Sequence, residues 1–239
     1  MKSLQGKKAL VLGGSRGIGA AIVKRLVQDG ADVTFTYHGS ADAAKKVAGE
    51  TGAKAVQADS GDRKSVSAVI AGQGTLDILV VNAGIGFFGD PLAIKPEDVD
   101  RMIDINVRGP YHAAVDAARK MKNGGRIVII GSVNGDCMPF TGGAAYALTK
   151  SAVQGMVRGL ARDLGPREIT INNVQPGPVD TDMNPANGPL KEMMLSKMAI
   201  KRYAKAEEIA GMVTYLVGPE AAIVTGAQHT IDSGFGVLT

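Results

Sequence analysis

Tyr146 and Lys150 lie four residues apart, a spacing that places both side chains on one face of a helix. A free tyrosine has a pKa of about 10 and is a poor acid–base catalyst at neutral pH. An ammonium group ~4 Å from the phenol, at an effective dielectric of ~20, would favour the phenolate by up to roughly 4 kcal/mol, or about 3 pKa units. We therefore expect Lys150 to lower the pKa of Tyr146 into a catalytic range. The pair alone is a weak signal, because it also occurs on solvated helix faces.

Ser132 stands one loop before this pair and follows a predicted buried strand over residues 126–130. Its hydroxyl is placed to hold an oxygen atom of a substrate while Tyr146 exchanges a proton with it. Asn106 lies within a predicted helix, where asparagine is intrinsically unfavourable, so a special role is expected. A buried asparagine with satisfied hydrogen bonds is an equally good interpretation. The candidate catalytic residues are Asn106, Ser132, Tyr146 and Lys150.

A glycine-rich turn near the N-terminus is suited to binding a phosphate group. Four glycines occur within residues 13–19, directly after an apolar run at 10–12 and before apolar residues at helical spacing. The glycines let the backbone approach an anion, and the helix N-terminus offers free N–H groups. A loop that merely joins strand to helix is the less favoured interpretation. The turn predicts cofactor contacts from Gly13, Ser15, Arg16, Gly17, Ile18 and Gly19.

Together these motifs resemble the short-chain dehydrogenase/reductase family over essentially the whole chain. The resemblance rests on residues that occur in the family's order and rough spacing: Gly13-xxx-Gly17-x-Gly19, Asn82-Ala83-Gly84, Asn106, Ser132, Tyr146, Lys150 and Pro176-Gly177. Two positions depart from the family pattern. Leu12 stands where the family usually has Thr, which removes a polar contact of the turn, and Val81 replaces the first Asn of its Asn-Asn-Ala-Gly motif.

The resemblance implies an enzyme that interconverts a carbonyl and an alcohol by hydride transfer. Tyr146 would donate or accept the proton, Ser132 would steady the carbonyl, Lys150 would bind the nicotinamide ribose, and Asn106 would hold a water relay. Asp59 would contact the adenine, although an acid just after a strand is also often a helix cap. The other cofactor contacts implied are Ser60, Asn82, Ala83, Gly84, Tyr146, Lys150, Pro176, Gly177, Val179 and Thr181.

The end of the predicted second strand, 32–37, selects between the two nicotinamide cofactors. NAD sites commonly place an acidic residue there to hold the ribose 2′-hydroxyl. This chain has none, and its residues at that point that would contact the cofactor are Tyr37, His38 and Ser40. Arg16 reaches the same space and suits a 2′-phosphate, for a charged hydrogen bond worth roughly 1.5–3 kcal/mol. We therefore predict NADP(H); a solvated Arg16 is the alternative.

Strand-like and helix-like patterns alternate along the chain without a linker or repeat. This alternation is typical of an α/β fold. We predict a single-domain, doubly wound Rossmann-type parallel sheet of about seven strands, with helices on both faces, over residues 1–239. The predicted strands cover 10–12, 32–37, 53–57, 78–81, 126–130, 169–174 and 228–231, and the predicted helices include 41–50, a long one from Pro96, and 206–217.

Composition narrows the possible partners. The net charge of +4 comes from scattered basic residues, which argues against nucleic-acid binding. A single Cys and three separated His give no disulfide and no metal cluster, and fit a reducing compartment. Since no apolar run reaches the ~20 residues of a membrane span and no signal segment is seen, we expect a cytoplasmic protein.

The loops around the predicted site point to an apolar small-molecule substrate. Phe87, Phe88 and Phe140 suggest an apolar lining, and methionines between 183 and 200 suggest a substrate lid, although ordinary packing explains them as well. The tail at 232–235 resembles the family's subunit contact, which implies a homotetramer or homodimer.

A second interpretation is a regulator that binds a nucleotide signal on the same fold. Residues 132–139, 184–189 and 229–232 resemble a bacterial member of the family that binds cyclic di-GMP. That resemblance implies a basic residue at the position of Cys137, so a phosphate site there would be weakened. We read Cys137 itself as a packed residue of the loop or of the substrate mouth.

Overall fold

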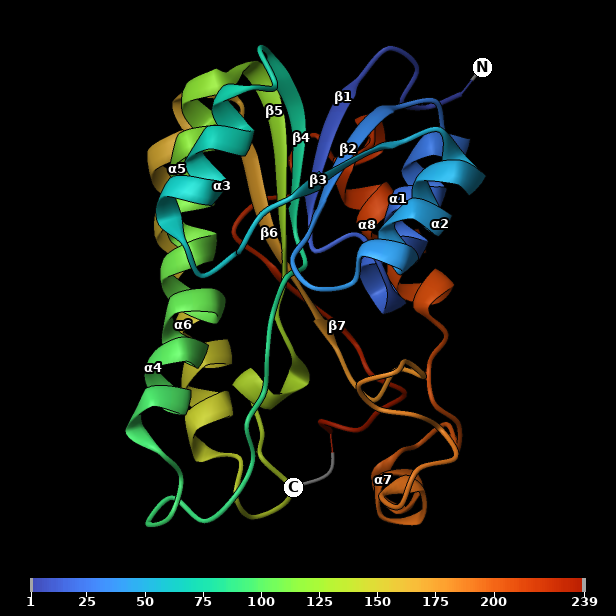
Figure 1. The fold of residues 1–239 in the computed structure, drawn as a ribbon, viewed down its shortest axis with the longest axis vertical. Helices are drawn as coiled ribbons and strands as arrows, with labels where there is room; N and C mark the ends of the chain where they lie inside the picture. Colours follow the sequence, from blue (N-terminus) through green and yellow to red (C-terminus); the bar gives the residue numbers. More distant parts are fainter. Residues whose placement is uncertain (1, 238–239) are drawn as a thin grey trace.

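Seven strands of the computed structural model, which describes residues 2–237, form one parallel sheet in the order β3-β2-β1-β4-β5-β6-β7 (Figure 1). The order reverses at β1, which pairs with both β2 and β4. This is the predicted doubly wound sheet. The strands are β1 (Lys8–Leu12), β2 (Asp32–Tyr37), β3 (Lys54–Gln57), β4 (Leu76–Val81), β5 (Met121–Ile130), β6 (Thr170–Pro176) and β7 (Gln228–Ile231).

Helices cover both faces of the sheet. Figure 1 shows α1, α2 and α8 on one side and α3 to α6 on the other, while α7 lies apart, beyond the carboxyl ends of the strands. The helices are α1 (Gly17–Gln28), α2 (Ala41–Thr51), α3 (Arg63–Ala71), α4 (Pro96–Ile103), α5 (Gly109–Lys120), α6 (Ala144–Leu164), α7 (Lys191–Lys197) and α8 (Ala206–Val217), with the π-helical η1 (Asp104–Arg108) and the short 3₁₀ segments η2 (Val133–Gly135), η3 (Gly165–Arg167) and η4 (Pro219–Ala221).

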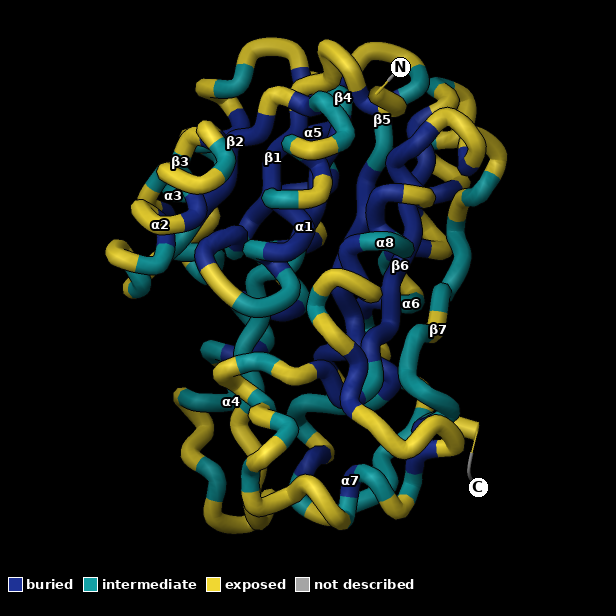
Figure 2. Tube along the Cα trace, turned by 90° about the vertical axis from the view of Figure 1, so that its right-hand side faces the viewer, coloured by how far each residue is buried: buried dark blue, intermediate teal, exposed yellow. Residues whose placement is uncertain are grey.

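Alternation along the strands divides the core into two layers. In β1, Ala9 and Val11 pack with α1 and α8, whereas Leu10 and Leu12 pack on the α5 and α6 side. Both faces of the strand are therefore apolar, as parallel sheets covered on both sides require. Figure 2 shows the strands as the buried centre of the molecule, with more exposed chain around α4 and α7. No helix within residues 2–237 is long and apolar enough to cross a membrane.

Two predicted elements differ substantially from the structure, while several other predicted bounds are off by one or two residues. The strand expected to begin at 126 begins at Met121, and the long helix expected from Pro96 is interrupted by η1. Pro110, at the start of α5, has no backbone N–H and so leaves a carbonyl of the preceding turn without a helical partner. Single π-type turns within α-helices are rare and occur frequently at functional sites.

Candidate active site

The glycine turn between β1 and α1 is closed to side chains. A Cβ on Gly19 would lie 2.0 Å from the carbonyl oxygen of Gly13, and one on Gly13 would lie 2.8 Å from the backbone of Ala83. Gly13 and Gly17 have φ angles of +82° and +52°, which favour glycine. The side-chain amide of Asn82 donates to the Gly13 carbonyl at 2.7 Å, so the Asn82-Ala83-Gly84 motif fastens the turn from β4.

The N-terminus of α1 is left open by its own side chains. Arg16 is the N-cap residue and its side chain makes no capping bond within the described residues, and the first turn holds no acidic residue. Free N–H groups at a helix start favour a pyrophosphate. The glycines leave the backbone of this turn accessible, and among the described residues no capping or acidic side chain occupies the anion site at the helix start. The residues present therefore fit a dinucleotide cofactor.

Thr36 replaces the polar contact that Leu12 does not provide. Its hydroxyl accepts the N–H of Gly13 at 3.0 Å, and its carbonyl accepts the N–H of Gly14 at 2.8 Å. Leu12 instead is buried, and its carbonyl accepts the N–H groups of Asn82 and Ala83. The turn is therefore held from both neighbouring strands despite the departure from the family pattern.

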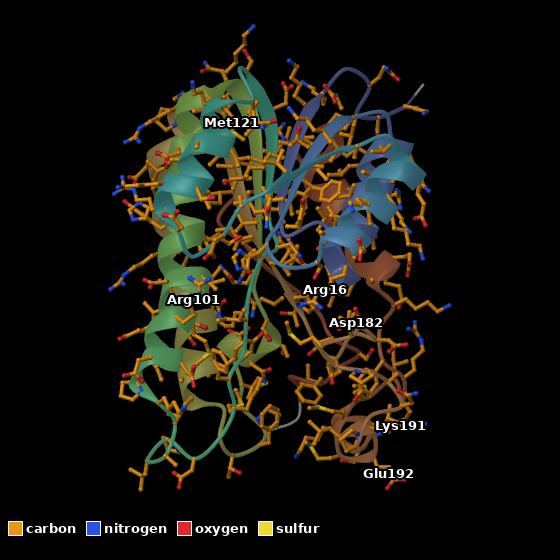
Figure 3. The ribbon with its side chains drawn as sticks, viewed as in Figure 1. Arg16, Arg101, Met121, Asp182, Lys191 and Glu192 are labelled. Atoms are coloured by element: carbon orange, nitrogen blue, oxygen red, sulfur yellow. The ribbon has the colours of Figure 1, made fainter. Side chains whose placement is uncertain are left out.

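The end of β2 carries the residues expected to contact a ribose phosphate. Tyr37 is the last residue of the strand, His38 is exposed, and Ser40 precedes α2. Figure 3 shows Arg16 near the carboxyl ends of the strands, on the side of α1. Arg16 is exposed, so its guanidinium stands beside a strand end that offers no carboxylate.

Asp59, predicted as an adenine contact or a helix cap, does not cap α3; Asp62 does, by accepting the N–H of Lys64. Asp59 instead accepts from Nη2 of Arg101 at 2.7 and 2.8 Å and from the N–H of Gly61. Partial burial alone would raise the pKa of Asp59, but the Gly61 and Arg101 contacts outweigh it and hold that pKa below its usual value. Arg101 lies on α4 (Figure 3). Ser60, the next residue, lies with its carbonyl against Gly109.

Ser132 lies two residues after the end of β5 and accepts the N–H of Asn134 at 3.1 Å, so it caps the short η2 segment. Tyr146 and Lys150 lie on α6, and the Lys150 ammonium donates to the carbonyl of Ile130 at 3.2 Å. The chain at 84–86 passes directly beside them. A Cβ on Gly84 would lie 3.4 Å from both Lys150 Nζ and Asn106 Oδ1, and one on Gly86 would lie 3.2 Å from the Tyr146 ring.

The expected lowering of the Tyr146 pKa is wrong for this structure. Burial raises the pKa of Tyr146 above its usual value, and a hydrogen bond with Ser132 offsets only part of that rise. The ammonium lies 5.6 Å from the ring centroid, and burial lowers the pKa of Lys150 itself to about 8. The penalty for burying charge is therefore larger than the attraction between the two groups.

Asn106 is buried in η1 with its side-chain amide fully bonded. It accepts the N–H of Ile85 at 3.0 Å and donates to the Ile85 carbonyl at 2.8 Å and to the Thr149 hydroxyl at 3.1 Å. Thr149 in turn donates to the carbonyl of Tyr146 at 2.8 Å. Asn106 thus connects the π-helical turn, the 84–86 segment and the first turns of α6.

The stretch expected beside the nicotinamide follows β6. Gly177 packs closely against Asp232, Val179 pairs with Ala204, and a Cβ on Gly17 would lie 3.3 Å from the Thr181 side chain. Residues 176–181 therefore run from the sheet to the glycine turn, and the structure brings two distant parts of the predicted site together.

Four residues of the site were missed by the sequence analysis: Thr36, Arg101, Asn134 and Thr149. Asn134 had a local signal, since Ser is a preferred N-cap residue whose oxygen accepts an N–H two or three residues later. The other three act through contacts between elements far apart in the sequence, which a local pattern does not indicate.

Comparison with known proteins places this geometry in a family. A family model described as enoyl-(acyl carrier protein) reductase matches residues 13–236. The cyclic-di-GMP-binding biofilm dispersal mediator protein of Escherichia coli strain K12 is 65% identical over 236 residues, which cover 99% of this chain and 100% of that protein.

Similar solved structures carry a nicotinamide cofactor. The crystal structure of BdcA in complex with NADPH matches with a TM-score of 0.97 and 65% identity, covering 98% of this chain and 96% of that one. A short-chain dehydrogenase from Burkholderia cenocepacia J2315 in complex with NADP matches with a TM-score of 0.95 and 47% identity, covering 98% and 99%. Their cofactors are the kind that the sequence predicts here, and the resemblance inferred from the motifs is confirmed: the chain belongs to the short-chain dehydrogenase/reductase family.

Proposed function

We propose that the chain is an NADP(H)-dependent oxidoreductase that interconverts a carbonyl and an alcohol. The observation that carries the proposal is the convergence at 84–86 of side chains from three elements. Ser132 comes from the end of β5, Asn106 from η1, and Tyr146 and Lys150 from α6. A hydroxyl, a phenol and a buried ammonium at one point are the groups that proton transfer to a carbonyl oxygen needs.

The cofactor is held by the glycine turn, by Arg16 and by the strand ends around it. Arg16, with Tyr37, His38 and Ser40, binds the 2′-phosphate, and Asp59 and Ser60 bind the adenine. Residues 82–84 and Pro176, Gly177, Val179 and Thr181 flank the ribose and nicotinamide. When bound, NADPH supplies the hydride that reduces the carbonyl carbon.

Ser132 donates a hydrogen bond to the carbonyl oxygen, and Tyr146 gives its proton to the same oxygen. The raised pKa of Tyr146 keeps that proton on the phenol at neutral pH, which suits the direction of reduction. Lys150, with a pKa of about 8, is mostly charged at pH 7 and binds the nicotinamide ribose. The side chain of Asn106 fixes the backbone at Ile85, and its backbone carbonyl holds the water relay that resupplies the proton.

The test measures oxidation of NADPH and NADH side by side against ketones, aldehydes, diketones and 3-oxoacyl thioesters. Turnover with NADPH, and much less with NADH, is the expected result. An inactive protein that still binds NADPH tightly would contradict the catalytic assignment.

The second candidate function is binding of cyclic di-GMP, favoured by the 65% identity to a relative named for that activity. Titration calorimetry with and without saturating NADPH tests it. The expected signal is binding that competes with NADPH or alters its affinity. No heat of binding at tens of micromolar nucleotide would rule this candidate out.

Two further features belong to the proposed enzyme. Residues 183–200 form a substrate lid, in which Met183 is exposed while Met194 and Met198 pack against Tyr203 and Phe235. The chain assembles as a homotetramer or homodimer, which light scattering on the purified protein would measure directly.

A further inference from the structure

Asp136 joins the loop after Ser132 to two other elements. Its Oδ2 accepts from Nε2 of Gln175 at 2.6 Å, and its Oδ1 accepts from Nε2 of Gln154, also at 2.6 Å. Gln175 belongs to β6 and Gln154 to α6, the helix that carries Tyr146. One exposed carboxylate therefore connects β6, the second strand from the edge of the sheet, to the helix that carries Tyr146.

Gln175 transmits this contact to Ser132. The same Nε2 donates to the backbone carbonyl of Ser132 at 3.2 Å, and the Gln175 side chain is fully buried. Its Oε1 has no hydrogen-bond partner within the described residues. Reversing the amide would turn that oxygen toward the Asp136 carboxylate and the Ser132 carbonyl, neither of which can donate a hydrogen bond. The amide orientation is thus fixed by its two acceptors, at the expense of a buried oxygen left unpaired.

The loop is also pressed against α6. The hydroxyl of Ser151 donates to the carbonyl of Gly135 at 2.7 Å. A Cβ on Gly135 would lie 2.9 Å from the carbonyl oxygen of Lys150 and 3.0 Å from Nε2 of Gln154. No side chain fits between the loop and the helix, so a shift of one changes the distance from Ser132 to Tyr146.

We propose that Asp136 and Gln175 are positioning residues that fix the Ser132 hydroxyl relative to Tyr146, and this rests on the proposed reductase function. Gln175 anchors the Ser132 backbone from β6, and Asp136 holds Gln175 in the orientation that does so. Neither residue contacts the substrate. Their effect on the reaction passes through the position of one hydroxyl, for which small displacements have large consequences.

The decisive variant is Gln175→Leu, which separates stability from positioning. Leucine is of similar size, removes the unpaired buried oxygen, and leaves Asp136 free to face water and Gln154. The melting temperature should stay equal or rise, whereas kcat should fall about tenfold with little change in NADPH Kd. Asp136→Ala should lower kcat similarly. Asp136→Asn should keep most of the wild-type kcat, because its amide oxygen can take the place of Oδ2 and accept from Gln175, while the side chain of Gln154 turns to accept from the new amide NH₂.

A further readout distinguishes positioning from a general loosening of the fold. Since the Ser132 contact lowers the pKa of Tyr146, weakening it should move the alkaline limb of kcat/KM for carbonyl reduction to higher pH in Gln175→Leu. Asp163→Ala, at an exposed position near the end of α6, is the matched control and should behave as wild type.

The outcomes separate the two proposals. A wild-type protein that reduces no carbonyl compound overturns the proposed function and this inference with it. An active wild type with a Gln175→Leu variant of unchanged kcat and pH profile overturns the positioning role alone. If Gln175→Leu fails to fold, the comparison of Asp136→Ala with Asp136→Asn becomes the test. Equal kcat values in these two variants would overturn the positioning role.

Discussion

The ammonium nitrogen of Lys150 lies 5.6 Å from the centroid of the Tyr146 ring, and its hydrogen bond goes to the carbonyl of Ile130. Burial lowers the pKa of Lys150 to about 8. An unfolded lysine has a pKa of about 10.4, so between these values the unfolded chain binds more protons than the folded chain. The contribution of Lys150 to the free energy of unfolding therefore rises with pH across that interval, and below pH 8 its burial is a penalty.

Lys150→Met removes this penalty. We expect the variant to be more stable than wild type at pH 7, by about 1–3 kcal/mol after the lost bond to Ile130 is allowed for. The difference should shrink as pH rises from 8 to 10.5. Urea unfolding at several pH values measures it. Lys122→Met, at an exposed position, should show no such trend. A stability difference independent of pH would contradict a buried, titrating Lys150.

Tyr146→Phe tests the proton donor. Only the hydroxyl is lost, and loss of general acid catalysis typically lowers a rate by about 10²–10⁴-fold. We expect kcat to fall by at least about 10²-fold. NADPH affinity, measured by fluorescence, should stay within a few-fold of wild type. Tyr111→Phe, on the exposed face of α5, is the matched control. Turnover retained in Tyr146→Phe would assign the acid to another group.

Arg16→Ala tests the cofactor preference. The loss of one charged hydrogen bond, roughly 1.5–3 kcal/mol, corresponds to about 10- to 150-fold weaker binding of NADPH. NADH affinity should not change, because NADH has no 2′-phosphate. Arg25→Ala, at the far end of the same helix and paired with Asp29, should leave both affinities intact. An equal loss for the two cofactors would mean that Arg16 acts on the pyrophosphate.

Local patterns were sufficient to predict the sheet. The last strand and the last helix have the predicted bounds, 228–231 and 206–217, because alternation and helical periodicity are properties of neighbouring residues. The start of β5 at Met121 was not predicted, since Lys122, Asn123 and two glycines follow it and have low strand propensity. In the structure Met121 pairs with Leu76, and an irregularity of register separates this pair from the next, Ile78 with Arg126.

The chemistry of the site depended on contacts that no local pattern contains. The pair Asp136 and Gln175 is separated by 39 residues, and the pair Asp59 and Arg101 by 42. Spacing in the sequence brought Tyr146 and Lys150 to one helix face but gave no measure of their burial. Burial reverses the expected direction of the Tyr146 pKa, and it is set by the chain at 84–86 and by Phe88.

Phe88 is the residue for which we predict an effect on substrate choice. Its ring lies 5.1 Å from the Tyr146 ring and 6.0 Å from the Phe140 ring, while the Gly89 N–H bonded to the Gly142 carbonyl holds the two loops together. An aryl group on a bound ketone gains a tilted aromatic contact here, worth about 0.5–1.5 kcal/mol. Phe88→Ala should therefore lower kcat/KM for aryl ketones by about 2- to 12-fold.

The matched control is Phe87→Ala, because the Phe87 backbone faces Met102 and its ring has no aromatic partner among the described residues. Kinetics with one aryl ketone and one small aliphatic diketone compare the two variants. The kcat/KM for the aryl ketone divided by that for the aliphatic diketone should fall in Phe88→Ala and stay unchanged in Phe87→Ala. If the aryl ketone instead reacts faster in Phe88→Ala, the ring at 88 obstructs the substrate, and the aryl preference is wrong.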